Sequence, residues 1–184
     1  SLMPLLNSIA TPYAEALLQV AESREETDTV AEQAKTLLTV LRSSPELKAA
    51  LASPVLEPEA KKAALAKLFN DQVTPSVQNL LKLLADRQRL PMMEAVLMRF
   101  LELYRELRNI TLAKVTSASS LSEEQQAELN RKVQAIAGSK SVEFDLVVDP
   151  SLIGGFIVSM GSQVIDASLS GQVRRLGLAL AQVS

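Results

Sequence analysis

The sequence predicts a mainly α-helical protein with a small α+β part: an N-terminal six-helix bundle over residues 1–108, then a small C-terminal sheet with two helices over residues 109–184. Apolar residues recur at helical spacing early in the chain, and they alternate with polar residues after Ser141, as in a strand with one solvated face. Seven of the eight prolines lie at or before Pro91, whereas all six glycines lie at or after Gly138. Because proline starts and stops helices and glycine supplies the backbone angles of hairpins, this segregation indicates two domains.

Apolar residues three and four positions apart define the first three helices. The first is predicted from about residue 8 to residue 22. Its apolar stripe consists of Ile9, Tyr13, Leu17 and Ala21, widened by Ala10, Ala14 and Leu18. A polar connection leads to a second helix, whose stripe begins at Val30 and ends at Leu41. Pro45 suits the first position of a short third helix, because that position has no intrahelical partner for an N–H group.

Proline and threonine mark the starts of the next three helices. Pro58 opens the fourth, and Thr74 caps a fifth whose first residue is Pro75. The apolar edge of the fifth helix consists of Val77, Leu80, Leu81 and Leu84, broadened by Leu83. This helix is more apolar than a one-sided surface helix requires. The sixth helix is predicted from Pro91 to about Arg108, which places the domain boundary directly after it.

The second domain begins with a strand over residues 110–117, which are β-branched and alternating. Ser122 and Gln125 have the spacing of a capping box, and the helix that they start is expected to end near Gly138. The remaining elements are a strand from Val142, a hairpin that turns at Gly161 and Ser162, and a helix over about residues 168–183.

The composition excludes several classes of function. The chain has no cysteine, histidine or tryptophan, so thiol and imidazole nucleophiles and the usual zinc sites cannot be built. A net charge of −2 does not provide the cationic field that binding to a nucleic-acid backbone needs. No stretch is long and apolar enough to span a membrane. We therefore expect no catalytic, cofactor-binding or metal-binding residues, no nucleic-acid partner and no membrane span.

Three features could carry chemistry, and each has a simpler interpretation. Gly154 and Gly155 follow a strand, but no phosphate-loop motif surrounds them, so a bulge or turn is the better interpretation. The acids Asp145, Asp149 and Asp166 have no spacing that requires a shared pocket. A group of arginines could face RNA or an acidic helix, although a solvated bundle face suits their spacing better; they are Arg87, Arg89, Arg99, Arg105 and Arg108.

The first and fifth helices have apolar residues over more of their circumference than one buried face requires. Surplus apolar surface in a small bundle can form a groove for the amphipathic helix of a partner. Ordinary tight packing between helices accounts for the pattern equally well, and periodicity does not separate the two interpretations.

Two motifs resemble the delta subunit of rotary (F-type) ATP synthases, a family whose mitochondrial member is the oligomycin-sensitivity-conferring protein. The stronger motif consists of residues 149–155, Gly161, residues 164–168, Gly171 and residues 174–176. The weaker one is Pro12-Tyr13-Ala14 in the first helix. The resemblance covers nearly the whole chain, but it departs from the usual pattern at four positions predicted to be exposed: Ser159, Ser162, Gln163 and Ser170.

The resemblance implies a non-catalytic stator subunit, present in one copy per complex, that holds the catalytic head still while the rotor turns. Its helical domain would bind the N-terminal helix of an alpha subunit in a groove between the first and fifth helices. Its second domain would join the b-type subunits of the peripheral stalk. The protein would lie on the cytoplasmic or stromal face of an energy-transducing membrane, either a bacterial plasma membrane or a thylakoid.

The resemblance also implies which residues meet the partners. Those expected in the groove are Tyr13, Ala14, Leu17, Leu18, Val77, Leu80, Leu81 and Leu84. Leu176 and Leu180 are expected at the stalk contact. The alternative from another class of protein is a helical RNA-binding or regulatory adaptor, which salt-dependent RNA binding would distinguish.

Overall fold

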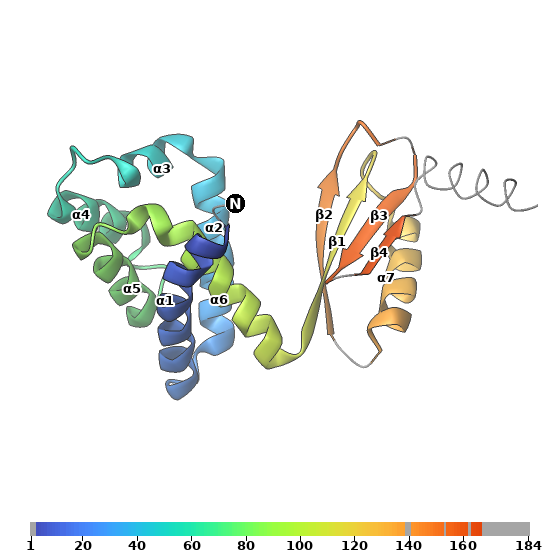
Figure 1. Ribbon diagram of the computed structural model, residues 1–184, viewed down its shortest axis with the longest axis horizontal. Helices are drawn as coiled ribbons and strands as arrows, with labels where there is room; N and C mark the ends of the chain where they lie inside the picture. Colours follow the sequence, from blue (N-terminus) through green and yellow to red (C-terminus); the bar gives the residue numbers. More distant parts are fainter. Residues whose placement is uncertain (1–2, 139–140, 153, 162, 167–184) are drawn as a thin grey trace, which may run out of the picture. The chain divides into compact units, whose positions relative to one another are not determined.

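The computed structural model describes residues 3–138, 141–152, 154–161 and 163–166 (Figure 1). The fold is mostly helical with one small four-stranded sheet, as the sequence predicts. The chain divides into two compact units, residues 1–104 and residues 105–184. The predicted final helix, with Leu176 and Leu180, lies outside the described residues. In the part of the chain that the structure describes, no helix has the length and apolar character needed to cross a membrane.

Helices build the first unit. Its elements are α1 (Met3–Ser23), α2 (Thr27–Ser43), α3 (Pro45–Ala52), α4 (Pro58–Phe69), α5 (Pro75–Asp86), the 3-10 turn η1 (Leu90–Met92) and α6 (Met93–Arg108). The predicted starts at Pro45, Pro58 and Pro75 are confirmed. Thr74 caps α5 as predicted, because its hydroxyl accepts a hydrogen bond from the Val77 N–H group.

Two predicted helix starts were wrong. The first helix begins at Met3 rather than near residue 8, because nothing stops the helix before Ser8. Pro12 lies inside α1, where it donates no backbone hydrogen bond. At the other end of the unit, Pro91 belongs to the 3-10 turn η1, and α6 starts only at Met93. A short 3-10 turn is common at the N-terminus of an α-helix.

The core of the first unit is mainly apolar, with Thr27 and Ser76 as buried polar residues. Its largest fully buried side chains are Phe100, Leu37, Leu84, Met93, Leu97, Val30, Val77 and Val96. Three alanines of α1 are also fully buried: Ala10, Ala14 and Ala21. Small side chains at these positions let the neighbouring helices approach α1 closely. Because the face of α1 with these alanines is buried, other faces of the helix remain outside the core.

A salt-bridge cluster joins three helices of this unit. The Glu94 carboxylate of α6 accepts from Lys48 Nζ of α3 at 2.5 Å and from Arg42 Nε of α2 at 3.2 Å. The hydrogen bond from Lys48 lowers the pKa of Glu94; burial opposes it, and Arg42 adds to the lowering. The folded state stabilises the ionised Glu94 carboxylate. The cluster therefore contributes its full stability at pH values above the pKa that Glu94 has in the unfolded chain, and this contribution is lost as the pH falls through the lowered pKa of the folded state.

Glu94→Gln is therefore expected to cost about 1 kcal/mol of unfolding free energy near neutral pH, a modest value because Lys48 and Arg42 are half exposed. The difference from the wild type should disappear as the pH falls through the lowered pKa of Glu94. Urea unfolding at about pH 7 and about pH 3 measures both values. Glu32→Gln, in an exposed pair within α2, is the control with little expected effect. An equal loss at both pH values would show that charge is not the cause.

The described residues of the second unit form a mixed sheet with a helix on one face (Figure 1). Its elements are β1 (Ile110–Ser117), α7 (Glu123–Ala137), β2 (Ser141–Val148), β3 (Phe156–Met160) and β4 (Gln163–Asp166), in the spatial order β2-β1-β3-β4. β1 pairs parallel to β2 across the α7 crossover, and the other two pairings are antiparallel. The predicted capping box of Ser122 and Gln125 is confirmed. The core consists of Ala113, Val115, Leu129, Val133, Val158 and Met160.

The segment between β2 and β3 depends on two adjacent glycines. Asp149 accepts hydrogen bonds from both the backbone N–H and the hydroxyl of Ser151, which lowers the pKa of the Asp149 carboxyl. Gly154 and Gly155 then have φ angles of 63° and 66°, in the left-handed region. These residues form a turn into β3, so the glycine pair is architectural, as the sequence predicts.

Gly155→Val is expected to lower the stability of the second unit by roughly 1–2 kcal/mol, because a β-branched residue is strained at a positive φ angle. Thermal unfolding of the full chain measures the change. Ser159→Val adds the same side chain within β3, where valine suits the extended backbone, and is the matched control. Equal melting temperatures for both variants would contradict a strained position at Gly155.

Candidate functional site

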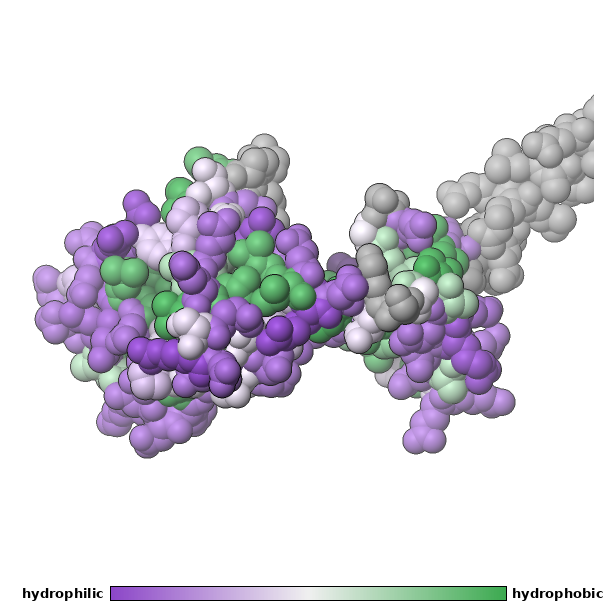
Figure 2. Space-filling view, turned by 90° about the horizontal axis from the view of Figure 1, so that it is seen from below, coloured by the Kyte–Doolittle hydropathy of each residue, from purple (hydrophilic) through white to green (hydrophobic). Residues whose placement is uncertain are grey.

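An apolar hollow lies between α1 and α5, which contact each other in the first unit. Its volume is about 270 Å³, and we call it the α1/α5 groove. It is lined by Tyr13, Ala16, Leu17, Val20 and Arg24 on one side and by Ser76, Asn79, Leu80 and Leu83 on the other. Figure 2 shows hydrophobic side chains that reach the surface of this unit between hydrophilic ones. A groove of this kind suits the apolar face of another helix.

Helical spacing explains why these side chains share the groove. Tyr13, Leu17 and Val20 follow at intervals of four and three residues along α1, and Leu80 and Leu83 are three residues apart on α5. Leu17 and Leu80 are buried and form the floor. Val20 and Leu83 form the rim, where each keeps more than a third of its surface exposed, 39% and 38%. The rim therefore offers apolar surface that a partner could cover.

Two arginines that follow α5 contact Tyr13, which is one of the residues that line the groove. The Tyr13 hydroxyl accepts from Arg89 Nη1 at 2.9 Å and from Arg87 Nη1 at 3.3 Å. Both guanidinium groups also lie over the ring, with distances to its centroid of 5.7 Å and 5.9 Å. Burial raises the pKa of the Tyr13 hydroxyl, but the hydrogen bonds and positive charges of the arginines outweigh it, so the pKa lies below its ordinary value.

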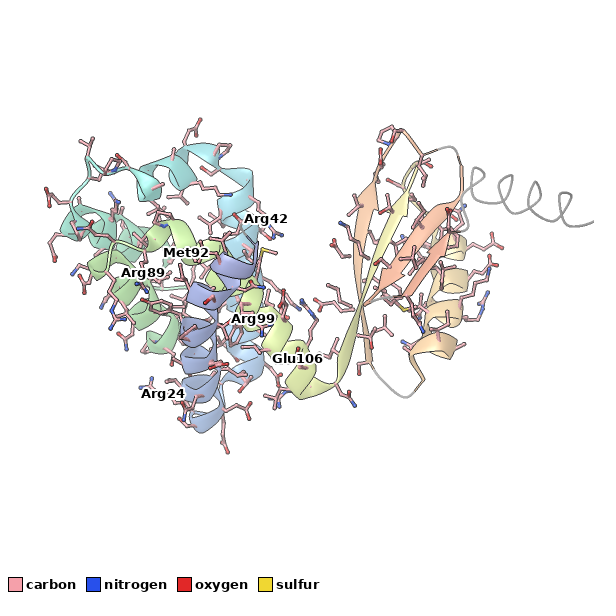
Figure 3. The ribbon with its side chains drawn as sticks, in the orientation of Figure 1. Arg24, Arg42, Arg89, Met92, Arg99 and Glu106 are labelled. Carbon is pink, nitrogen blue, oxygen red and sulfur yellow. The ribbon has the colours of Figure 1, made fainter. Side chains whose placement is uncertain are left out.

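Part of the lining of the groove is polar. Arg24 follows the last residue of α1, and Figure 3 places it and Arg89 well apart along the helical unit. Ser76 lies in the first turn of α5 and is 6% exposed, and among the described residues its hydroxyl oxygen has no hydrogen-bond partner. Tyr13, in the first half of α1, contacts Arg87 and Arg89 just after the end of α5. Arg24, just after the end of α1, lines the same hollow as Ser76 in the first turn of α5, so α1 and α5 run in opposite directions.

The structure divides the residues that were expected in the groove into three groups. Tyr13, Leu17 and Leu80 line it together. Ala14, Val77 and Leu84 are buried in the core and reach no surface, while Leu18 is half-buried against that core. Leu81 is 3% exposed and lies on another side of α5, beside Leu65 and Phe69 of α4.

Several groove residues were not expected from the sequence. They are Ala16, Val20, Arg24, Ser76, Asn79 and Leu83. Val20 could have been found by extending the stripe of Leu17 by three residues, and Leu83 was noted only as a broadening of the fifth helix. The polar lining residues, Arg24, Ser76 and Asn79, could not be found from the hydrophobic pattern. They belong to the groove only because α1 and α5 pack against each other.

A second hollow, of about 520 Å³, lies between α7 and the β2 side of the sheet in the second unit. Its apolar lining includes Leu129, Val142, Phe144 and Leu146, and its polar lining comes from α7. Leu146 and Val148 of β2 are about half exposed, 52% and 51%. Within the described residues, no group of three or more acidic side chains could hold a metal ion.

Comparison with known proteins finds similarity along the whole chain. The family model described as "ATP synthase delta (OSCP) subunit" matches residues 9–180. The ATP synthase subunit delta of Synechococcus sp. (strain CC9311) is 68% identical over 99% of this chain and 100% of the relative. The organellar chromatophore ATP synthase subunit delta of Paulinella chromatophora is 67% identical over 98% of this chain and 100% of the relative.

Solved structures with a similar fold include one from a mitochondrial ATP synthase. It is a chain in the cryo-EM structure of the Toxoplasma gondii mitochondrial ATP synthase hexamer, with a TM-score of 0.73 and 26% sequence identity. The match covers 92% of the present chain and 96% of the other chain. The likeness therefore includes both units.

Proposed function

We propose a function for each unit on the basis of the family, because this chain belongs to the ATP synthase delta (OSCP) subunit family. It is a non-catalytic stator subunit of an F-type ATP synthase, associated peripherally with an energy-transducing membrane. The family places it with ATP synthase subunits and not with RNA-binding adaptors. The finer assignment concerns which surface holds which partner.

The helical domain, predicted over residues 1–108, is proposed to bind the catalytic head. The observation that carries this proposal is the α1/α5 groove, with its buried floor of Leu17 and Leu80 and its exposed rim of Val20 and Leu83. An amphipathic helix would cover this apolar surface, and the N-terminal helix of the alpha subunit is the proposed occupant. Burial contributes about 25 cal/mol per Å² of apolar area, from which the cost of association must be subtracted.

Residues 109–184 are proposed to join the b-type subunits of the peripheral stalk. Supporting this, β2 has two half-exposed apolar residues, Leu146 and Val148, and Leu146 lines the second hollow, so this side of the sheet has apolar surface that a partner could cover. Leu176 and Leu180 remain candidates for the same contact. The protein, in one copy per complex on the cytoplasmic or stromal face, would then link two partners through two separate units.

The mechanism is mechanical. A stator link resists the torque of the rotor, so it needs slow dissociation from both partners and no reaction of its own. Differences in affinity between related complexes come mostly from the dissociation rate. A few well-packed interface residues account for most of the binding energy. The six helices of the first unit, acting as one bundle, would transmit the force from the groove to the second unit.

Calorimetric titration of the full chain tests the two assignments. One titrant is a peptide of the alpha subunit N-terminal segment, and the other is a C-terminal fragment of the b-type subunits. A change at the groove rim, Leu83→Glu, should weaken the first interaction and leave the second unchanged. A change on β2, Leu146→Glu, should do the opposite. If each variant weakens both interactions, or neither, the assignment of one partner to each unit is wrong.

A further inference from the structure

The turn after α5 holds two arginines that bind Tyr13, a residue of the α1/α5 groove. Arg87 and Arg89 flank Gln88, which has a φ angle of 56° in the left-handed region. The backbone N–H of Arg87 donates to the Leu83 carbonyl at 3.0 Å, and that of Arg89 donates to the Leu84 carbonyl at 2.7 Å. These bonds close the end of α5 as a C-terminal capping turn does. In this turn both arginine side chains point toward Tyr13, to which they donate hydrogen bonds.

Each arginine keeps donors that Tyr13 does not use. A guanidinium group carries five N–H donors, and one Nη1 of each arginine donates to the Tyr13 hydroxyl. Both residues are exposed. Among the described residues, neither arginine forms an ion pair with a carboxylate. The adjacent carboxylate, Asp86, pairs instead with Lys62 Nζ at 2.6 Å.

We propose that Tyr13, Arg87 and Arg89 form a carboxylate-binding subsite that pairs with an acidic side chain of the helix in the α1/α5 groove. This inference rests on the proposed function, because the occupant is taken to be the alpha subunit helix. Two convergent guanidinium groups match the oxygens of a carboxylate, and such bonds add geometric specificity as well as affinity. The apolar floor alone would let an amphipathic helix slide by a turn, whereas a paired acid fixes its register.

A double-mutant cycle tests the subsite. The double variant Arg87→Gln/Arg89→Gln of the full chain is titrated with the alpha subunit N-terminal peptide, and with peptides in which each Asp or Glu is changed in turn to its amide. We expect the protein change to raise the dissociation constant about five- to tenfold at low salt. One peptide acid should account for most of that change, because removing it leaves the arginines nothing to pair with.

Lys82→Gln is the matched control, since it removes a positive charge from α5 but lies beside Lys62 and Phe69, on the side away from the groove. It should change the dissociation constant less than about twofold. The effect at the arginines should shrink as salt rises, because the Debye length falls from about 10 Å at 0.1 M to about 3 Å at 1 M.

The outcomes separate the inference from the proposed function. Coupling to one peptide acid supports the subsite. Tight binding of the peptide with no coupling at any acid, or with equal effects of the double variant and Lys82→Gln, overturns the subsite and leaves the groove assignment standing. No binding of the peptide to the wild-type chain overturns both.

Discussion

Leu83→Glu is expected to weaken binding of the alpha subunit N-terminal peptide about a hundredfold while the helical unit stays folded. Leu83 lies on the rim of the α1/α5 groove and is 38% exposed, so the free protein can hold a glutamate there in contact with water. A bound helix would cover this position. The variant then loses the apolar contact and must bury part of a charge. Both effects raise the free energy of the complex and not that of the free protein.

Leu68→Glu is the matched control. Leu68 is 48% exposed on α4, and it is not among the residues that line the groove. A glutamate there should leave the dissociation constant unchanged, since solvent accepts the new charge in both the free and the bound protein. Calorimetry gives the constants, and circular dichroism shows whether each variant is folded. Binding of the folded Leu83→Glu protein at wild-type affinity would remove α5 from the contact.

The groove itself could be anticipated from the sequence, but only in part. The spacing of Tyr13 and Leu17 on α1, and the surplus apolar residues on α5, indicate that these two helices have more apolar surface than a core needs. Periodicity does not tell which of two apolar neighbours faces the core. Leu81 and Leu83 have equal hydrophobicity and lie on one helix, yet the first is buried and the second is on the rim. Leu81 is buried because it packs beside α4, and this contact between two helices cannot be predicted from the hydrophobic pattern of α5 alone.

The subsite at Tyr13 was beyond prediction for a different reason. It joins residues that are 74 and 76 positions apart, and it depends on the left-handed backbone of Gln88. Glutamine is not a residue that signals a positive φ angle, in contrast to glycine. The turn into β3 was predicted correctly, because Gly154 and Gly155 do signal one.

Leu81→Glu is expected to destabilise the helical unit by roughly 3–5 kcal/mol, and this loss has nothing to do with partner binding. Leu81 is 3% exposed and belongs to the buried core. It lies beside Leu65 and Phe69 in a site with a free volume of only about 10 Å³, so a glutamate there has no room for water to solvate its charge. A domain of this size has an unfolding free energy of about 5–15 kcal/mol, so the variant loses a large part of it.

Urea unfolding of the full chain measures this loss, and Leu81→Met is the control. Methionine keeps the volume and the apolar character of leucine, so it should cost less than about 1.5 kcal/mol. Any weaker binding of the alpha subunit peptide by Leu81→Glu should match the unfolded fraction at the same temperature, whereas Leu83→Glu should lose affinity with no unfolding. A stable Leu81→Glu protein that fails to bind the peptide would place Leu81 in the contact and would require α5 to turn toward the partner on binding. The two substitutions, two residues apart on one helix, therefore separate the residues that support the groove from those that form it.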